Sequence, residues 1–292
     1  GVFEVKATNG DLAELKAENE KLKAKVAEQA EILAKTRDIL TAKYDFVCSV
    51  GSDCGCAWHL TTNRLRPASY PLDWVGTELI GIEGVAALID RDFKGFLDPE
   101  NLERNPNPPR GPMDDHKHDY YCDRGAGIIA VHDFPTGVPL EESYPAVKAK
   151  YDRRIDRFYR TIRASGRVLL IYWTWRVYSE PEAIRKAAEI FRAKFPEQRV
   201  DLLVMRNADV PELRSEILGE GVFAIDGAFH PAGGHPAYGD LELNRRVFSR
   251  IRLRGKRRRI LREWFAHARM KFVSAFIFNR EKRHAYRERH DV

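Results

Sequence analysis

The chain has 292 residues, 43% of them hydrophobic and 32% charged, which allows one large domain or two ordinary domains with a buried core. It contains no apolar run of the roughly 18 residues that a membrane-spanning helix needs, and its N-terminus is not a signal peptide. Four unevenly placed cysteines do not form a secreted disulfide framework and favour a reducing cytoplasm. Because the sequence begins Gly-Val-Phe-Glu without Met, we expect a segment of a longer polypeptide.

The charge is distributed unevenly. Residues 245–292 hold 17 Lys and Arg against 4 Asp and Glu, whereas the other 244 residues hold 32 against 39. The body of the protein is therefore mildly acidic, and only its C-terminal part should be attracted to polyanions as a whole.

Residues 11–43 are rich in Ala, Glu, Lys and Leu and contain neither Gly nor Pro, which predicts one long helix. A heptad frame passes through Leu12, Leu15, Asn19, Leu22, Val26, Gln29, Leu33, Thr36 and Leu40. An Asn at a core position favours a parallel dimer in fixed register. We therefore expect self-association through a coiled coil over 11–43, with a single solvated helix as the alternative.

The predicted globular domain, residues 44–244, begins with an apolar strand over 44–50 that ends at Gly51. A helix from about Cys54 to Asn63 and a weaker helix at 84–91 follow. Residues 98–125 carry five prolines among polar residues, which predicts a loop. A second apolar strand over 127–131 ends directly at His132-Asp133-Phe134.

The following stretch predicts a parallel arrangement. Residues 147–162 form an amphipathic helix, 168–173 a nearly continuous apolar strand, and 200–205 another strand. Between the two strands, Ser179-Glu180-Pro181-Glu182 combines a capping box with Pro at a helix start. We therefore predict an α/β fold with an at least partly parallel sheet flanked by helices. A further apolar run covers 222–225.

Gly51-Ser52-Asp53-Cys54 joins the first strand to the first helix. Unpaired N–H groups and the positive end of the helix dipole favour a thiolate there, and the same N–H groups suit an oxyanion. Asp53 opposes this effect, since an adjacent carboxylate disfavours a second negative charge. Cys54 is thus the candidate nucleophile, with a small buried hydrophobe as the alternative. Cys56 would face away and pack.

A base and a carboxylate are expected to complete such a site. His132 stands at the end of a predicted strand, and Asp133 or Asp73 is the candidate for orienting it. Asp133 would project to the opposite side from His132 if the strand continued. A loop histidine with satisfied hydrogen bonds is the alternative reading of His132.

The motifs Val50-Gly51-Ser52-Asp53-Cys54, Tyr70-Pro71-Leu72-Asp73-Trp74 and His132-Asp133-Phe134 together resemble a bacterial family of unknown function described as papain-like cysteine peptidases. The likeness extends from about Tyr44 to Asn207 and includes Lys150-Tyr151-Asp152-Arg153-Arg154-Ile155. The family usually has Phe where this chain has Leu72. The resemblance implies that Cys54 is the nucleophile and His132 the base, with an Asp completing the set.

A papain-like fold packs its cysteine helix against a mainly antiparallel sheet, whereas residues 166–206 indicate a parallel β-α-β unit. A strand followed by Gly-Ser-x-Cys and a helix also resembles the nucleophile turn of doubly wound hydrolases and acetyltransferases. In that case the Asp226-Gly227-Ala228-Phe229-His230 loop is the alternative source of the base, through His230. The pattern favours the parallel sheet over the papain fold.

Ser52 and the pair Arg153-Arg154 are candidate substrate-binding residues, the arginines for an anionic group such as a phosphorylated or nucleotide-linked sugar. A solvated helix face is the alternative for the arginines. Asp114, Asp115, His116, His118, Asp119 and Cys122 lack standard zinc-finger spacing. There is no Walker loop and no Gly-x-Gly-x-x-Gly fingerprint. We therefore expect neither a metal nor a cofactor.

These features predict a cytoplasmic, thiol-dependent acyl-transfer enzyme, either an amide or ester hydrolase or an acyltransferase, working in bacterial surface-glycan biosynthesis. The alternatives are a glycan-assembly transferase such as a glycosyltransferase, in which Cys54 is structural, and a non-enzymatic coiled-coil assembly module.

The C-terminal extension, 245–292, includes an apolar stripe interleaved with arginines: Leu261, Trp264, Phe265, Ala268, Phe272, Ala275 and Phe276. A basic amphipathic helix of this kind is typical of proteins held peripherally on anionic membranes. Packing of the stripe on the catalytic domain is the alternative. Specific nucleic-acid binding is not expected, because no recognised motif accompanies the charge.

Overall fold

The structure is a computed structural model that describes residues 18–20, 23, 42–106, 108, 116–175, 178–232 and 234–255. Residues 18–20 and 23 are helical. The rest of the predicted coiled coil up to residue 41, and the basic stripe beyond Gly255, lie outside the described residues. Both therefore stay predictions.

The centre of the fold is a five-stranded sheet in the order β2-β7-β8-β10-β9. Its strands are β2 (Phe46–Ser49), β7 (Arg167–Thr174), β8 (Arg199–Asn207), β9 (Arg214–Gly219) and β10 (Val222–Gly227). Strands β2, β7, β8 and β10 are parallel, and β9 pairs antiparallel with β10. The predicted parallel β-α-β unit is thus confirmed, and the carboxyl ends of four strands meet at one edge of the sheet.

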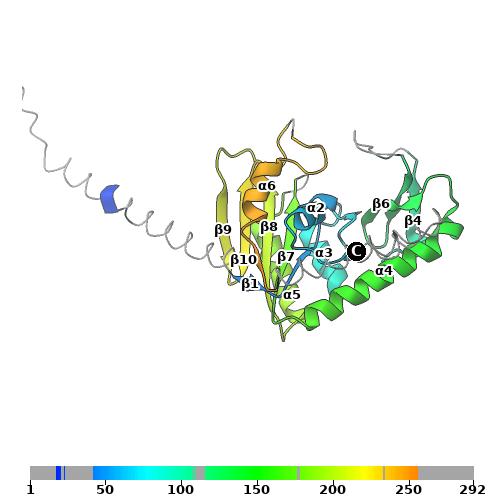
Figure 1. The fold of residues 1–292 in the computed structure, drawn as a ribbon, viewed down its shortest axis with the longest axis horizontal. Helices are drawn as coiled ribbons and strands as arrows, with labels where there is room; N and C mark the ends of the chain where they lie inside the picture. Colours follow the sequence, from blue (N-terminus) through cyan, green and yellow to red (C-terminus); the bar gives the residue numbers. More distant parts are fainter. Residues whose placement is uncertain are drawn as a thin grey trace, which may run out of the picture.

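Helices cover both faces of this sheet. On one face lie α3 (Gly81–Asp90), α5 (Pro181–Lys194) and part of α4 (Leu140–Arg163); on the other lie α2 (Cys54–Thr62) and α6 (Leu241–Phe248). Alternate residues of the inner strand β7 pack into the two cores, so that Leu170 lies on the α5 side and Leu169 on the α2 side. The result is a three-layer α/β domain (Figure 1).

A second, antiparallel sheet has the order β3-β6-β5-β4. It comprises β3 (Val75–Gly76), β4 (Leu102–Asn105), β5 (His118–Asp123) and β6 (Ile128–Pro135), and the 3-10 helix η1 (Pro99–Asn101) precedes β4. The prediction of a continuous loop over 98–125 was therefore wrong. It failed because two of the three buried positions of β5 are Asp119 and Asp123, beside Tyr121, so the strand lacks an apolar alternation.

Two other local features differ from the predictions. The N-cap of α5 is Glu180, without a side-chain cap, rather than Ser179. The predicted domain boundary at residue 244 falls inside α6, and β11 (Arg252–Leu253) then pairs in parallel with β1 (Lys43–Tyr44). The described fold therefore extends to Gly255, and Lys43 lies in a strand rather than in the leading helix.

Helix α4 runs along the side of the molecule from the antiparallel sheet towards the five-stranded sheet (Figure 1). Its apolar residues and those of the antiparallel sheet belong to the same core as α3 and α5. Within the described ranges, no helix has both the length and the apolar character that a membrane crossing requires.

Candidate active site at Cys54

The turn between β2 and α2 lies at the carboxyl edge of the five-stranded sheet. Gly51 has φ of +128°, and a Cβ on this residue would lie 2.5 Å from Thr77 Oγ1 and 2.7 Å from Tyr172 Cε2. Glycine is therefore required both by conformation and by space. Ser52 continues the pairing with β7: its N–H and its hydroxyl both donate to the carbonyl of Trp173, at 2.9 and 3.1 Å. The Ser52 side chain is buried, and its hydroxyl proton is used within the fold.

Asp53 caps the helix that begins at Cys54. Its Oδ1 accepts the N–H of Gly55 at 2.8 Å, and its Oδ2 accepts the indole N–H of Trp175 at 2.5 Å. The Cys54 side chain is half-buried at the first position of α2, at the positive end of the helix dipole. The predicted helix start is confirmed.

The four cysteines have different environments. Cys48 and Cys56 are fully buried, and burial raises the pKa of both thiols well above the usual range. The predicted packing of Cys56 is confirmed. Cys54 and Cys122 are half-buried, and of these two only Cys54 lies at a helix N-terminus. Cys54 is thus the best placed of the four to act as a nucleophile.

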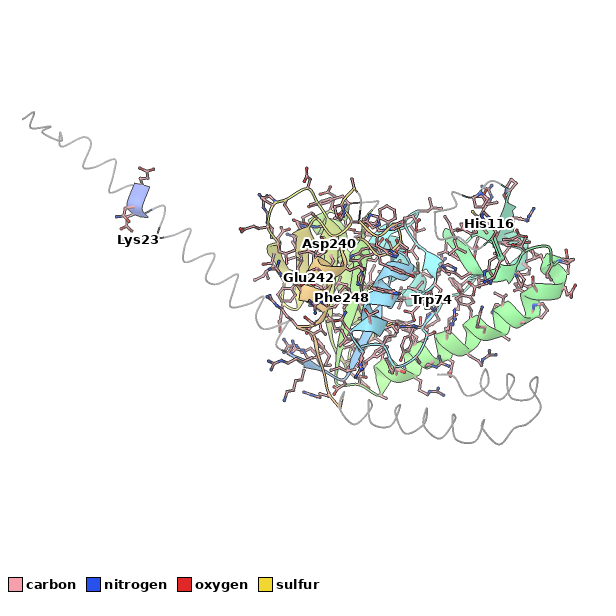
Figure 2. The ribbon with its side chains drawn as sticks, turned by 45° about the horizontal axis from the view of Figure 1, so that its top comes forward. Lys23, Trp74, His116, Asp240, Glu242 and Phe248 are labelled. Carbon is pink, nitrogen blue, oxygen red and sulfur yellow. The ribbon has the colours of Figure 1, made fainter. Side chains whose placement is uncertain are left out.

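Strand β3 connects the cysteine turn to the strand that carries His132. At one end, Thr77 donates its N–H and its hydroxyl to the carbonyl of Ser52, at 2.7 and 3.2 Å. Val75 and Gly76 then pair with β6. At the other end, the Trp74 ring packs edge-on against His132, with ring centroids 6.1 Å apart. Trp74 lies between the two sheets (Figure 2). The three sequence motifs therefore meet around β3, and Thr77 and Trp74 are about 10 Å apart along an extended chain.

His132 lies in an irregular part of β6. The pairing of β5 with β6 shifts register between Asp119 and Tyr121, which leaves residues 131–133 opposite Tyr120. Such a bulge redirects side chains, often beside active sites. His132 is exposed, whereas Asp133 is buried on the other side, as the predicted strand geometry requires.

Asp133 is engaged by α4 rather than by an imidazole in its described contacts. Its two oxygens accept hydrogen bonds from Lys150 Nζ at 2.5 Å and from the Tyr151 hydroxyl at 2.7 Å. Burial, with the nearby Asp133 charge, raises the pKa of Tyr151 well above its usual range. The Tyr151 hydroxyl therefore stays protonated and donates the hydrogen bond. Asp133 thereby fastens β6 to α4.

Asp73 is fully buried beside Arg66. Its Oδ2 accepts from Arg66 Nη1 at 2.8 Å and from the Tyr70 N–H at 2.7 Å, while Oδ1 accepts no hydrogen bond from the part of the chain that the structure describes. Burial raises the pKa of Asp73 to about 6, with the Arg66 charge acting against it. The Arg66 guanidinium lies over the Trp74 ring at 5.2 Å. In the described contacts, Asp73 is therefore connected to His132 indirectly: Asp73 binds Arg66, Arg66 lies over Trp74, and Trp74 packs against His132.

The loop after β10 supplies the alternative base. His230 stacks on Trp175 with ring centroids 3.9 Å apart, and its Nε2 donates to the carbonyl of Pro236 at 3.2 Å. Trp175 in turn donates to Asp53, next to Cys54. Asp226 instead binds Arg206, whose Nε lies 2.6 Å from its Oδ1. The predicted loop thus brings His230 near the cysteine turn, with Asp226 engaged elsewhere.

Three aromatic residues near Cys54, namely Trp58, Trp175 and Tyr238, were not predicted from the sequence. Tyr238 stacks on Trp58 at 4.3 Å and on His235 at 4.4 Å, and burial together with the nearby Cys54 thiol raises its pKa. Trp58 is four residues after Cys54 in α2, so both lie on the same helix face. Trp175 follows the predicted strand that contains Trp173. Because side chains alternate along a strand, Trp173 and Trp175 lie on the same side of the sheet. No sequence pattern marks Tyr238.

The candidate pair on α4 is divided between solvent and interior. Arg153 is exposed, whereas Arg154 is half-buried with its guanidinium 4.9 Å from the centre of the Tyr151 ring. Consecutive helical residues point about 100° apart, so the two arginine side chains leave α4 in different directions. The Nη1 atom of Arg154 is buried and has no hydrogen-bond partner among the described residues.

In the segment 114–122, where the sequence predicts no metal site, Asp114 and Asp115 lie outside the described residues, and Asp119 pairs with Arg104 at 3.0 Å. Over the described part of the chain, no three His, Cys, Asp or Glu side chains come together in a way that would hold a metal ion.

The fold and the site define an α/β domain with a cysteine at the start of a helix on the carboxyl edge of its sheet. The family described as "Putative papain-like cysteine peptidase (DUF1796)" matches residues 45–194, and the chain belongs to this family. The matched region contains Cys54, Asp73, His132 and Asp133.

The chain is also similar to an uncharacterized protein of Acanthamoeba polyphaga mimivirus, with 31% identity over 133 residues. That match covers 42% of this chain and 59% of the viral protein, so the chain spans less than two thirds of this relative. No solved structure matches the chain.

Proposed function

We propose that the protein catalyses thiol-dependent acyl transfer, as an amide or ester hydrolase or as an acyltransferase. The observation that carries this proposal is the position of Cys54, half-buried at the first residue of α2. Membership of a cysteine peptidase family whose match includes Cys54 and His132 supports it. A thiol at a helix N-terminus lies at the positive end of the helix dipole, in a turn whose N–H groups suit an oxyanion.

In the proposed reaction, His132 takes the proton of the Cys54 thiol, the resulting thiolate attacks the substrate carbonyl, and the carbonyl electron pair moves to oxygen. When the tetrahedral intermediate collapses, the C–N or C–O bond breaks and His132, as imidazolium, gives its proton to the leaving amine or alcohol. Water, or an acceptor hydroxyl or amine, then attacks the thioester carbonyl while the now neutral His132 takes its proton, and the C–S bond breaks to release Cys54. Asp73 acts indirectly, through Arg66 and Trp74, by fixing the position of His132.

The proposed substrate is an acylated or amide-bearing group of a surface glycan with an anionic part. Arg154 supports the anionic part, because its buried Nη1 lacks a hydrogen-bond partner among the described residues. The exposed Arg153 offers a second charge at some distance from it. The predicted coiled coil and basic extension suit an enzyme that works on such material at a membrane.

The experiment uses p-nitrophenyl acetate as the acyl donor. We expect a burst of nitrophenolate and an acetyl group on Cys54 in peptide mass spectrometry. The variant Cys54→Ser should lose both, and the matched control Cys122→Ser should keep both. Acetylation spread over Lys residues without a burst, or a burst that survives Cys54→Ser, would refute the proposal.

The open parallel sheet favours a second candidate, a nucleotide-sugar-dependent glycosyltransferase in which Cys54 is structural. In open α/β sheets, ligands bind outside the carboxyl ends of the strands, and β2, β7, β8 and β10 end together here. This candidate predicts binding of UDP-sugars, measured by calorimetry, that Cys54→Ser leaves unchanged. The acyl-transfer proposal instead predicts acetylation of Cys54 by p-nitrophenyl acetate, which a structural Cys54 would not give.

A further inference from the structure

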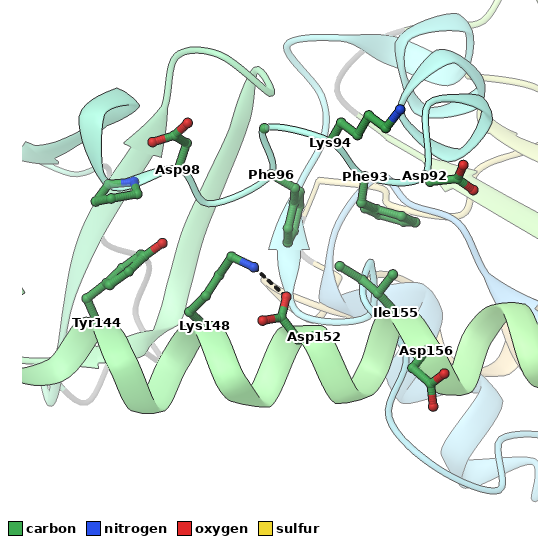
Figure 3. A pocket seen from close by; sticks show the side chains of 12 residues that line it. Asp92, Phe93, Lys94, Phe96, Asp98, Tyr144, Lys148, Asp152, Ile155 and Asp156 are labelled. Carbon is green, nitrogen blue, oxygen red and sulfur yellow. Dashed lines mark hydrogen bonds and ion pairs between the residues drawn. The ribbon is translucent and has the colours of Figure 1, made fainter.

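The groove between α4 and the segment 92–99 is part of the core rather than a binding site (Figure 3). Phe93 and Phe96 face α4 in Figure 3, and they are only 4% and 3% exposed. On the rim, Asp92 pairs with Lys194 at 2.7 Å. The apolar and charged groups of this groove are therefore used within the fold.

The loop between β10 and α6, described over 228–232 and 234–240, lies over the start of the cysteine-bearing helix. A Cβ added to Gly55 would lie 3.0 Å from the carbonyl oxygen of Ala237, so the loop backbone passes beside the residue that follows Cys54. His59 fastens the loop from the next turn of α2, because its Nε2 donates to the carbonyl of Tyr238 at 2.9 Å. The family match ends at residue 194, and this loop lies in the part of the chain that follows it.

A tight turn fixes the backbone of Tyr238. The N–H groups of Tyr238 and Gly239 donate to the carbonyl of His235, at 3.2 and 2.8 Å. The Nδ1 atom of His235 also accepts the N–H of Tyr238 at 3.2 Å. Gly239 has φ of +66°, and a Cβ on this residue would clash with the carbonyl of Phe229, so the turn requires glycine.

The ring of Tyr238 lies between two other rings. It stacks on Trp58 with centroids 4.3 Å and planes 8° apart, and on His235 with centroids 4.4 Å and planes 11° apart. Trp58 is one turn after Cys54 in α2. A helical side chain covers the surface on the N-terminal side of its own Cα, so the Trp58 indole places Tyr238 towards Cys54 rather than towards the far end of the helix.

The hydroxyl of Tyr238 and the thiol of Cys54 are close enough to interact electrostatically. Burial, and after it the charge on Cys54, raise the pKa of Tyr238. The hydroxyl therefore keeps its proton at neutral pH, also when the thiol has lost its own. Beside a thiolate, which has no proton to give, a protonated phenol acts as a hydrogen-bond donor.

We propose that Tyr238 is a further catalytic residue, whose hydroxyl donates a hydrogen bond to the sulfur of the Cys54 thiolate. This role rests on the acyl transfer proposed for Cys54. The thiol proton goes to His132, and Tyr238 keeps its own proton throughout. The hydrogen bond stabilises the negative charge on sulfur until the C–S bond forms and the charge moves to the carbonyl oxygen.

The test measures the rate at which iodoacetamide alkylates Cys54 in the full chain between about pH 5 and 10, by peptide mass spectrometry. The variant Tyr238→Phe keeps the stacked ring and removes the hydroxyl. We expect it to move the midpoint of the profile up by about one pH unit, because the thiolate loses a hydrogen bond. The matched control Tyr178→Phe removes the hydroxyl of an exposed tyrosine whose ring lies against Arg206, and it should leave the midpoint unchanged. Circular dichroism melting confirms that each variant is folded.

A second variant tests whether the ring stack positions the hydroxyl. Trp58→Leu removes the ring on which Tyr238 stacks, and we expect its midpoint to move up as well. The double variant Trp58→Leu, Tyr238→Phe should shift no further than Tyr238→Phe alone, since both changes remove the same hydrogen bond. A midpoint that stays in place or moves down in Tyr238→Phe would overturn the proposal, as would shifts that add in the double variant.

The nitrophenolate burst tests the acyl transfer separately from the role of Tyr238. A shifted alkylation profile without a burst would support the hydrogen bond to Cys54 and refute the acyl transfer. A burst at Cys54 together with an unshifted profile in Tyr238→Phe would refute only the role of Tyr238.

Discussion

The indole of Trp175 donates a hydrogen bond of 2.5 Å to Asp53, the residue that caps the cysteine-bearing helix. Through this contact, Trp175 at the carboxyl end of β7 holds the carboxylate of Asp53 next to Cys54. The ring of His230 stacks on the Trp175 indole. The donated hydrogen bond offsets part of the repulsion between Asp53 and a Cys54 thiolate. The environment of the nucleophile is therefore set by the five-stranded sheet.

The variant Trp175→Phe keeps a ring for His230 to stack on but removes the N–H. We expect the alkylation rate of Cys54 at pH 7 to fall about threefold, because the Asp53 charge is then less well compensated. We also expect a loss of about 1–2 kcal/mol in the free energy of unfolding, measured by urea denaturation.

Asp53→Asn is the opposite test, since Asn also caps helices but carries no charge. It should raise the alkylation rate of Cys54. A rate that falls in Asp53→Asn would show that the carboxylate helps the thiol, contrary to this account.

Two histidines compete for the role of base, and their substitution separates them. We expect His132→Gln to slow acetylation of Cys54 by p-nitrophenyl acetate by about 100-fold or more, the usual loss when a general base is removed. His230→Gln should slow it by less than about tenfold, because its Nε2 is occupied by Pro236. The reverse order would transfer the role to the loop after β10.

His59 predicts a pH dependence of stability. It is buried, its Nε2 donates to the carbonyl of Tyr238 at 2.9 Å, and burial lowers its pKa to about 4. Between pH 6.5 and 4 the unfolded chain then binds more protons at this residue, so its contribution to stability falls with falling pH, by about 3 kcal/mol in total.

The variant His59→Gln removes this contribution and isolates it from Asp73. The raised pKa of Asp73 works the other way: between about pH 6 and 4 the folded state takes up the proton, so Asp73 favours folding as the pH falls. We expect the wild type to lose more stability than His59→Gln between pH 7 and 4 in urea titrations. Parallel curves would contradict a buried, neutral His59.

The sequence predicted the parallel part of the fold because each of its elements carries its own apolar pattern. The run 168–173 and the helix face Ile184, Ala187 and Phe191 are buried as expected. Strand β5 was missed because its buried positions include Asp119 and Asp123, which are held by Arg104 and by backbone N–H groups. A pattern of apolar residues cannot reveal a strand that buries paired charges.

Within the site, the sequence predicted the residue types but not all of their partners. Cys54 begins its helix as expected, because Asp53 and the preceding Gly51 specify the turn locally. The engagement of Asp133 by Lys150 depends on how α4 crosses β6, a tertiary contact without a sequence signal. The coiled coil and the membrane contact lie outside the described residues and stay predictions.

The central claim is that Cys54 is the reactive thiol, and iodoacetamide labelling of the native full chain at pH 7, followed by peptide mass spectrometry, tests it most directly. We predict that Cys54 is alkylated at least about tenfold faster than Cys122, while Cys48 and Cys56 react only after denaturation because both are buried. If Cys54 reacts no faster than Cys122, it is a structural cysteine and the proposed acyl transfer is wrong.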